Sequence, residues 1–376
     1  MNLLQLITLI CIIFHIDQVI QQQSYGYNIA SCLAFIDKFS NTCDPTLPPA
    51  TDFDQMDFEE MQCSRPGLCP DLVTFNNCKW ERILCVTCRQ EGDDIFVRVQ
   101  TNGMPDHCYA EGQFPPQPKV IDFEIKWNSN DDTKTLVTNV ASQIEVDNKL
   151  CNNQTFFDNQ IPASRGFQIY QGDGDLNYAI GVGLNGVLLY PPISNVTGFD
   201  PIYPRGNTQQ IINRTVSIDR CLGTTFNESS TYHYHTVSYC SIQDTIPDAL
   251  YPDSCKNIQQ CRIAPLDYHI NQFVPQIRKK YPIGIAKDGN IIYGPYDASG
   301  QLWDQSTLDV CNGIFVDKQY AYVATPNFPY LVGCWGPGSV KKVSPQCTRN
   351  YKSSTIYLKL LSSELILLIM AIFLIY

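Results

Sequence analysis

Residues 178–192 read YAIGVGLNGVLLYPP, and residues 281–295 read YPIGIAKDGNIIYGP. The two stretches share Tyr, Ile, Gly, a second Gly, Tyr and Pro at six of fifteen aligned positions. Each contains an apolar run, then Asn185-Gly186 or Asp288-Gly289, then a second apolar run that ends in Tyr. Asn-Gly and Asp-Gly between apolar runs are typical of β-hairpins, because both central residues of a type I′ turn need positive φ angles. The sequence therefore predicts two related hairpins.

The similarity continues downstream of both hairpins. The segment Ile218–Gly223, IDRCLG, matches Leu308–Gly313, LDVCNG. The segment Tyr232–His235, YHYH, matches Tyr320–Val323, YAYV, and a cysteine ends each copy at positions 240 and 334. A repeat of this kind predicts two similar β units, residues 178–240 and 281–334, inside a domain of residues 151–350.

The Tyr-His-Tyr-His run is the strongest candidate for a functional site. Side chains alternate along a strand, so His233 and His235 are expected on one face and the two tyrosines on the other. Two imidazoles two residues apart can bind one Zn²⁺ or Cu²⁺ ion, with His269 or Asp219 as further candidate ligands. The alternatives are that the tyrosines pack in the core while the histidines hydrogen-bond to nearby backbone, or that the pair serves in acid–base catalysis.

With these motifs, the second half of the chain resembles the YHYH domain family over about residues 170–340. The Asp288-Gly289 hairpin that ends in Ile292–Pro295 supports the resemblance, as does Thr325–Tyr330, TPNFPY, followed by a cysteine. The resemblance implies a secreted or surface protein, and the family has no biochemical activity attached to it. Members usually carry further histidines at three positions where this chain has Thr224, Ala321 and Val323.

Cysteine content and charge indicate the compartment. The chain has 376 residues, 17 cysteines and a formal net charge of −11. Such an acidic chain lacks the basic surface that nucleic-acid binding requires. So many cysteines favour disulfides in an oxidising compartment over a zinc site at Cys85-Val-Thr-Cys88. Eight of them fall between residues 32 and 108 and eight between 151 and 347, which predicts a Cys-rich β region at 25–150.

The pairing of these cysteines stays open, because eight cysteines allow 105 pairings. Within the repeat, the candidate disulfide residues are Cys221, Cys240, Cys311 and Cys334. Alternating apolar residues predict strands at 94–102 and 119–128, and helical turns are expected only at 31–40 and 273–281. The expected fold is mainly β and disulfide-rich, with a duplicated β domain built as a sandwich or a barrel.

Both chain ends are apolar. Residues 1–24 resemble a secretory signal peptide. The segment 354–376, preceded by small residues from Ser353, is typical of a glycosylphosphatidylinositol (GPI) attachment signal, with a short transmembrane helix as the alternative. Four glycosylation sequons agree with a secretory chain. Their acceptors are Asn153, Asn195, Asn213 and Asn227.

These features predict a glycosylated, GPI-anchored protein on the outer face of the plasma membrane. The sequence contains no GxSxG, HExxH, Walker or GxGxxG motif. We therefore expect a non-catalytic coat or recognition role, with the membrane as partner through the lipid anchor and an extracellular protein or carbohydrate as ligand. The alternative is a metal-binding protein or metal-dependent enzyme that uses Zn or Cu at His233 and His235.

Overall fold

The computed structural model describes residues 25–62, 79–109, 116–127, 167–172, 176, 179–192, 202, 218–225, 231–242, 259 and 264–336. The expected signal peptide, the GPI signal with Ser353 and the four glycosylation sequons lie outside these residues. The described fold is mainly β, as predicted, with three sheets, and no sheet closes into a barrel within the described ranges. None of the helices in the described part of the chain is long and apolar enough to cross a bilayer.

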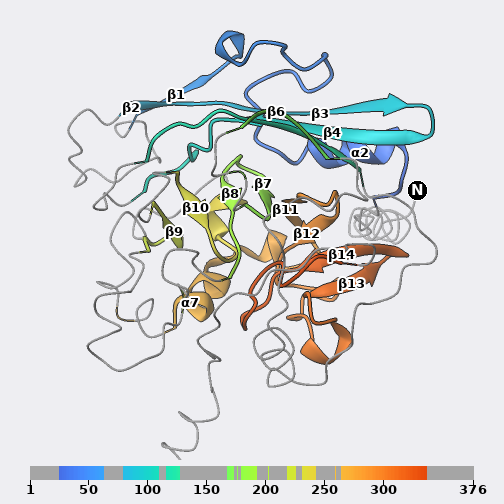
Figure 1. Ribbon diagram of the computed structural model, residues 1–376. Coiled ribbons are helices and arrows are strands. Elements are labelled where there is room, and N and C mark those ends of the chain that lie inside the picture. The colour runs from blue at the N-terminus through green and yellow to red at the C-terminus, as the bar shows by residue number, and fades with distance from the viewer. Residues whose placement is uncertain are drawn as a thin grey trace, which may run out of the picture.

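The N-terminal half forms a two-stranded and a four-stranded antiparallel sheet (Figure 1). The first contains β1 (Glu59–Gln62) and β2 (Lys79–Arg82). The second has the order β3-β4-β5-β6. Its strands are β3 (Leu84–Glu91), β4 (Asp94–Thr101), β5 (Ile121–Lys126) and β6 (Gln168–Gly172). Strands β4 and β5 confirm the two strands expected from alternating apolar residues.

The repeat forms an eight-stranded sheet with the order β13-β14-β12-β11-β7-β8-β10-β9. The first unit supplies β7 (Gly181–Gly183), β8 (Leu188–Leu189), β9 (Gly223–Thr224) and β10 (His233–Tyr234). The second unit supplies β11 (Pro282–Ala286), β12 (Ile291–Tyr293), β13 (Gly313–Val316) and β14 (Gln319–Val323). In each unit the first two strands form an antiparallel hairpin, β7–β8 or β11–β12. The second hairpin strand pairs in parallel with the last strand of the unit, β10 or β14. That last strand pairs antiparallel with the third strand, β9 or β13.

The two units are related by a local two-fold axis between β7 and β11. Val182 pairs with Ile285, its own counterpart in the repeat, and Gly183 pairs with Gly284. A methyl group at Gly181 or at its counterpart Gly284 would collide with a backbone carbonyl of the facing strand. The shared glycine of the two hairpins therefore allows the strands to approach closely at the axis.

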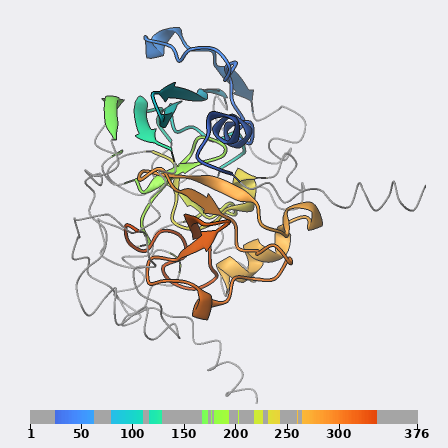
Figure 2. The same cartoon turned by 90° about the vertical axis from the view of Figure 1, so that its right-hand side faces the viewer.

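Two apolar cores lie on opposite faces of this sheet. Tyr320 and Tyr322 of β14 belong to one core, and Ala321 and Val323 belong to the other, because side chains alternate along the strand. The second core also contains the inner faces of β3, β4 and β5, and helix α2 (Ile29–Ile36). Figures 1 and 2 show α2 beside the four-stranded sheet, on its side toward the eight-stranded sheet.

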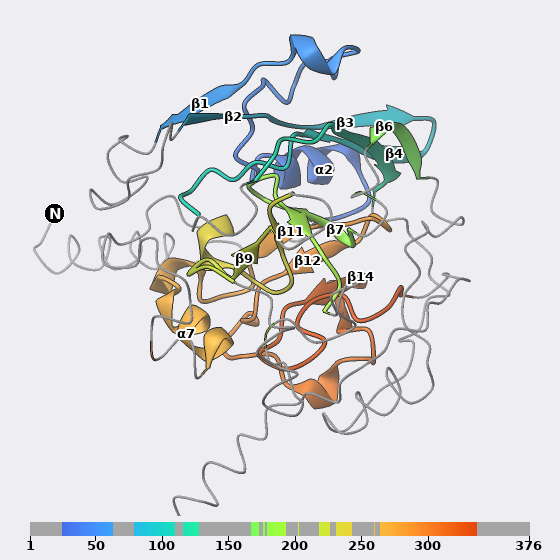
Figure 3. The same cartoon turned by 60° about the vertical axis from the view of Figure 1, so that its left-hand side comes forward.

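The two predicted regions thus share a core across residue 150. Strand β6, from beyond that position, pairs with β5 and completes the four-stranded sheet. The first core is covered by α7 (Pro265–Gln272), which lies far from the four-stranded sheet in Figure 3. Of the helical turns expected at 273–281, only the short 3-10 turn η7 (Pro275–Ile277) forms, and α7 ends before it. Short 3-10 turns also occur as η1 (Phe53–Gln55), η4 (Tyr239–Ser241) and η8 (Gln305–Thr307).

Disulfide bonds cross-link segments in both halves of the chain. Cys32 of α2 is bonded to Cys88, and Cys43 to Cys85, so the two cysteines of the CxxC motif have different disulfide partners. The four candidates in the repeat form two bridges at corresponding positions of the two units. They are Cys221–Cys240 and Cys311–Cys334. The expectation of disulfides in place of zinc is confirmed for these cysteines.

Candidate functional site

Each unit contains a buried aspartate that holds its Cys-x-Gly turn against the first tyrosine of the following strand. In the first unit, Asp219 accepts hydrogen bonds from the amide of Gly223 (2.9 Å) and the hydroxyl of Tyr232 (2.6 Å). The second unit repeats both bonds, at 2.7 and 2.8 Å, with Asp309, Gly313 and Tyr320. A methyl group at either glycine would overlap the tyrosine ring. The shared Asp-x-Cys-x-Gly motif therefore has a structural role in both units.

The second tyrosine of each run reaches back to the hairpin turn. In the second unit, the hydroxyl of Tyr322 donates to the carboxylate of Asp288 (2.6 Å). In the first unit, the hydroxyl of Tyr234 accepts from the amide of Asn185 (3.3 Å) and donates to Nε2 of His107. The direction follows because His107 Nδ1 donates to a backbone carbonyl (2.8 Å), which leaves Nε2 as the acceptor. The turn residues thus differ because the Tyr234 hydroxyl donates to His107 and is paired with a donor, Asn185, whereas the Tyr322 hydroxyl donates to Asp288 itself.

His233 and His235 lie side by side on the face opposite the two tyrosines, as predicted. Their ring centroids are 5.0 Å apart, and the planes are inclined by 81°. His233 Nδ1 donates to the carbonyl of Thr231 (2.8 Å), and His235 Nδ1 donates to the carbonyl of Pro191 (2.6 Å). Because carbonyls only accept, each Nε2 carries the lone pair of a neutral ring.

Burial keeps both rings neutral. The exposed fractions of His233 and His235 are 3% and 2%. Loss of hydration lowers the pKa of His233 to about 3, with a smaller contribution from the neighbouring His235, and lowers the pKa of His235 to about 4. Among the described residues, neither Nε2 has a hydrogen-bond partner.

Asp219 and His269 do not join the pair. Asp219 is occupied by Gly223 and Tyr232, and desolvation raises its pKa. His269, on α7, donates from Nε2 to the carbonyl of Arg220 and accepts at Nδ1 from the amide of Tyr239 (3.5 Å). Among the described residues, one group of three His, Cys, Asp or Glu side chains has its ligand atoms within 4.8 Å of one another. It contains none of His233, His235, Asp219 and His269.

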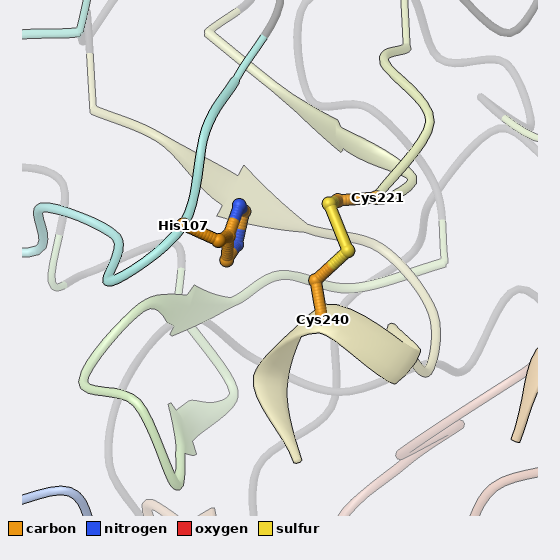
Figure 4. A group of neighbouring side chains, drawn as sticks. All are labelled: His107, Cys221 and Cys240. Carbon is orange, nitrogen blue, oxygen red and sulfur yellow. A yellow bond between two sulfur atoms is a disulfide. The ribbon is translucent and has the colours of Figure 1, made fainter. Parts of the chain in front are cut away.

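That group consists of His107, Cys221 and Cys240 (Figure 4). The figure shows His107 beside the disulfide that joins the two cysteines, with an S–S distance of 2.02 Å. Since both sulfurs are bonded to each other and both His107 nitrogens have hydrogen bonds, the group holds no free metal ligand in this state. The sequence offered His107 as a further histidine for the metal pair but did not predict its contact with Tyr234, because the two residues lie 127 positions apart.

A groove of about 760 Å³ lies in the N-terminal half, beside the β1–β2 hairpin. It is bordered by two small apolar clusters, separate from the main cores, that contain Trp80 with Met104 and Phe53 with Met56. The ring of Phe58 at its rim is 54% exposed. No sequence pattern indicated this groove, because its lining comes from separate segments of the N-terminal half.

The charged side chains that line the groove are three carboxylates, Asp54, Glu60 and Glu81, and two lysines, Lys79 and Lys119. Glu60 pairs with Lys79 (3.4 Å), whereas the exposed carboxylates of Asp54 and Glu81 have no hydrogen bond to any residue in the described ranges. Aromatic faces beside unpaired carboxylates suit a ligand that presents C–H surfaces and hydroxyl donors together. Comparison of the chain with family models, with curated proteins and with solved structures found no match to any of them.

Proposed function

We propose that this chain is a glycosylated cell-surface recognition protein, held by a GPI anchor and carrying a YHYH-like domain at residues 151–350. The apolar ends, the four sequons and the disulfides support an extracellular setting. The groove beside β1 and β2 carries the recognition role, because it combines exposed aromatic surface with unpaired carboxylates.

The ligand class that this groove fits best is carbohydrate. Sugar rings present C–H faces that pack on aromatic side chains such as Phe58, and their hydroxyls donate to carboxylates such as Asp54 and Glu81. A volume of about 760 Å³ lies within the roughly 300–1,000 Å³ range of small-molecule sites, so a short oligosaccharide fits it.

Glycan binding by the secreted ectodomain tests this proposal. An oligosaccharide found on a glycan array is titrated against wild type, Phe58→Ala and Glu81→Gln, and we expect each variant to bind at least tenfold more weakly. Leu302→Ala and Asp93→Asn change the same kinds of exposed side chain away from the groove and should bind like wild type. Binding only to cationic peptides, or equal affinities in all variants, contradicts the assignment.

Release from cells tests the anchor. Intact cells that express the full chain are treated with a phosphatidylinositol-specific phospholipase, and the protein should appear in the medium. Retention on cells whose other GPI-anchored proteins are released would favour the short transmembrane helix.

A further inference from the structure

The repeat provides an internal control for the role of His233 and His235. The corresponding residues on β14 are Ala321 and Val323, and both are fully packed in the apolar core. In both units the first tyrosine donates to the buried aspartate, and the second tyrosine hydrogen-bonds to the hairpin turn. The strand therefore forms without histidines in the second unit, so folding of this strand does not explain the pair in the first unit.

The chemistry of the pair is that of metal ligands. Each Nδ1 is held by a backbone carbonyl, which fixes the tautomer and leaves the Nε2 lone pair for an ion, as in most metal-binding histidines. Both rings are almost fully buried, which favours the neutral form that an ion requires. Tyr190 fixes the ring positions, since it stacks on His233 at 4.0 Å and meets His235 edge-on at 6.0 Å.

The spacing of the rings also fits one ion. Zn–N bonds of about 2.1 Å place each ring centroid about 3.2 Å from a shared ion. A centroid separation of 5.0 Å then corresponds to an angle of about 100° at the ion, close to the tetrahedral value of about 109°. A linear two-coordinate arrangement would need the centroids more than 6 Å apart, about 6.4 Å with the same bond lengths.

We propose that His233 and His235 form a two-histidine site for Zn²⁺ or Cu²⁺, whose remaining coordination positions are open to solvent or to a donor from a bound molecule. The site is independent of the groove proposed for recognition. Imidazole nitrogen suits both ions, and Cu²⁺ should bind more tightly than Zn²⁺, as it does to most nitrogen ligands.

The test uses the secreted ectodomain, stripped with a chelator and titrated with ZnCl₂ or CuSO₄ alone. Wild type should bind about one ion per chain, and the Cu²⁺ complex should show two nitrogen ligands by electron paramagnetic resonance. The variant His233→Ala/His235→Val reproduces the residues of the second unit, so it should fold normally and bind at least tenfold more weakly.

Thermal unfolding provides the control for folding. Zn²⁺ should raise the melting temperature of wild type and leave that of the double variant unchanged, because only the native pair binds the ion. His269→Gln, which alters a histidine with both nitrogens already hydrogen-bonded, should retain binding. Undiminished binding by the folded double variant, or no stoichiometric binding by wild type, overturns the proposal.

Discussion

The two units of the eight-stranded sheet share a framework but differ in their surroundings. Both contain the same aspartate cradle, the buried Asp219 or Asp309 that holds its Cys-x-Gly turn against a tyrosine. They also share the disulfide position and the glycine at the two-fold axis. The turn of the first unit contacts the N-terminal half, where Arg82 and Thr101 donate to its backbone carbonyls. Asp288 in the turn of the second unit instead accepts from residues of its own unit.

This difference separates residues that the sheet requires from residues that respond to a neighbour. The cradle is the same in both units because the turn and the tyrosine must fit each other wherever the unit lies. Asn185 and the histidine pair occur only in the first unit, whose hairpin turn contacts the N-terminal half. The substitutions below test that division, from the largest expected effect to the smallest.

The cradle should be equally necessary in both units. Asp309→Ala leaves two backbone amides and the hydroxyl of Tyr320 without their acceptor inside the core. We expect a loss of about 4 kcal/mol in the free energy of unfolding, measured with urea, from several buried donors that each lose a partner. Asp219→Ala should cost a similar amount. A loss in only one unit would show that the cradles are not equivalent.

The histidine pair should make the first unit sensitive to acid. A histidine whose pKa falls from about 6.5 unfolded to about 3 or 4 folded binds more protons when unfolded, so stability is lost as pH falls below about 6.5. The metal-free ectodomain should lose about 4 kcal/mol between pH 6.5 and 4.5 through this pair. Urea unfolding at each pH measures the loss.

The variant His233→Ala/His235→Val is the matched control, because Ala321 and Val323 occupy the same positions in the second unit and do not titrate. Its stability should fall less steeply over the same pH range. His269, whose pKa burial lowers to about 3, and Asp219, whose pKa burial raises, are present in both proteins and cancel in the comparison. Parallel curves for the two proteins would contradict the assigned protonation states.

Exchange of Asn for Asp, or of Asp for Asn, in the two hairpin turns should lower the free energy of unfolding. Asn185→Asp replaces an amide that donates to Asp106 (3.0 Å) and Tyr234 with a second carboxylate, so we expect a loss of about 2 kcal/mol. Asp288→Asn keeps an oxygen that can accept from Tyr322, and we expect about 1 kcal/mol. Urea unfolding of both variants measures the difference, and equal losses would count against the role given to His107.

The repeat was readable from the sequence because its signals are local. Asn-Gly and Asp-Gly predicted both hairpins, and both form, but the turns are not of type I′. Only Gly186 and Gly289 have positive φ angles, whereas Asn185 and Asp288 do not. Alternation predicted that His233 and His235 share a face. Helix α7 was missed because Pro265–Gln272 has few apolar residues, and its ends depend on packing against the first core.

By itself, the sequence determined the β class, the duplication, the face on which the histidines lie and the use of the repeat cysteines in disulfides. Each follows from spacing along the chain, which fixes alternation and turn geometry. Only the tertiary structure decided the two-fold axis, the core shared across residue 150, the contact of His107 with Tyr234 and the groove beside β1. These join segments far apart in the chain, and such contacts arise from close packing, which no local pattern records.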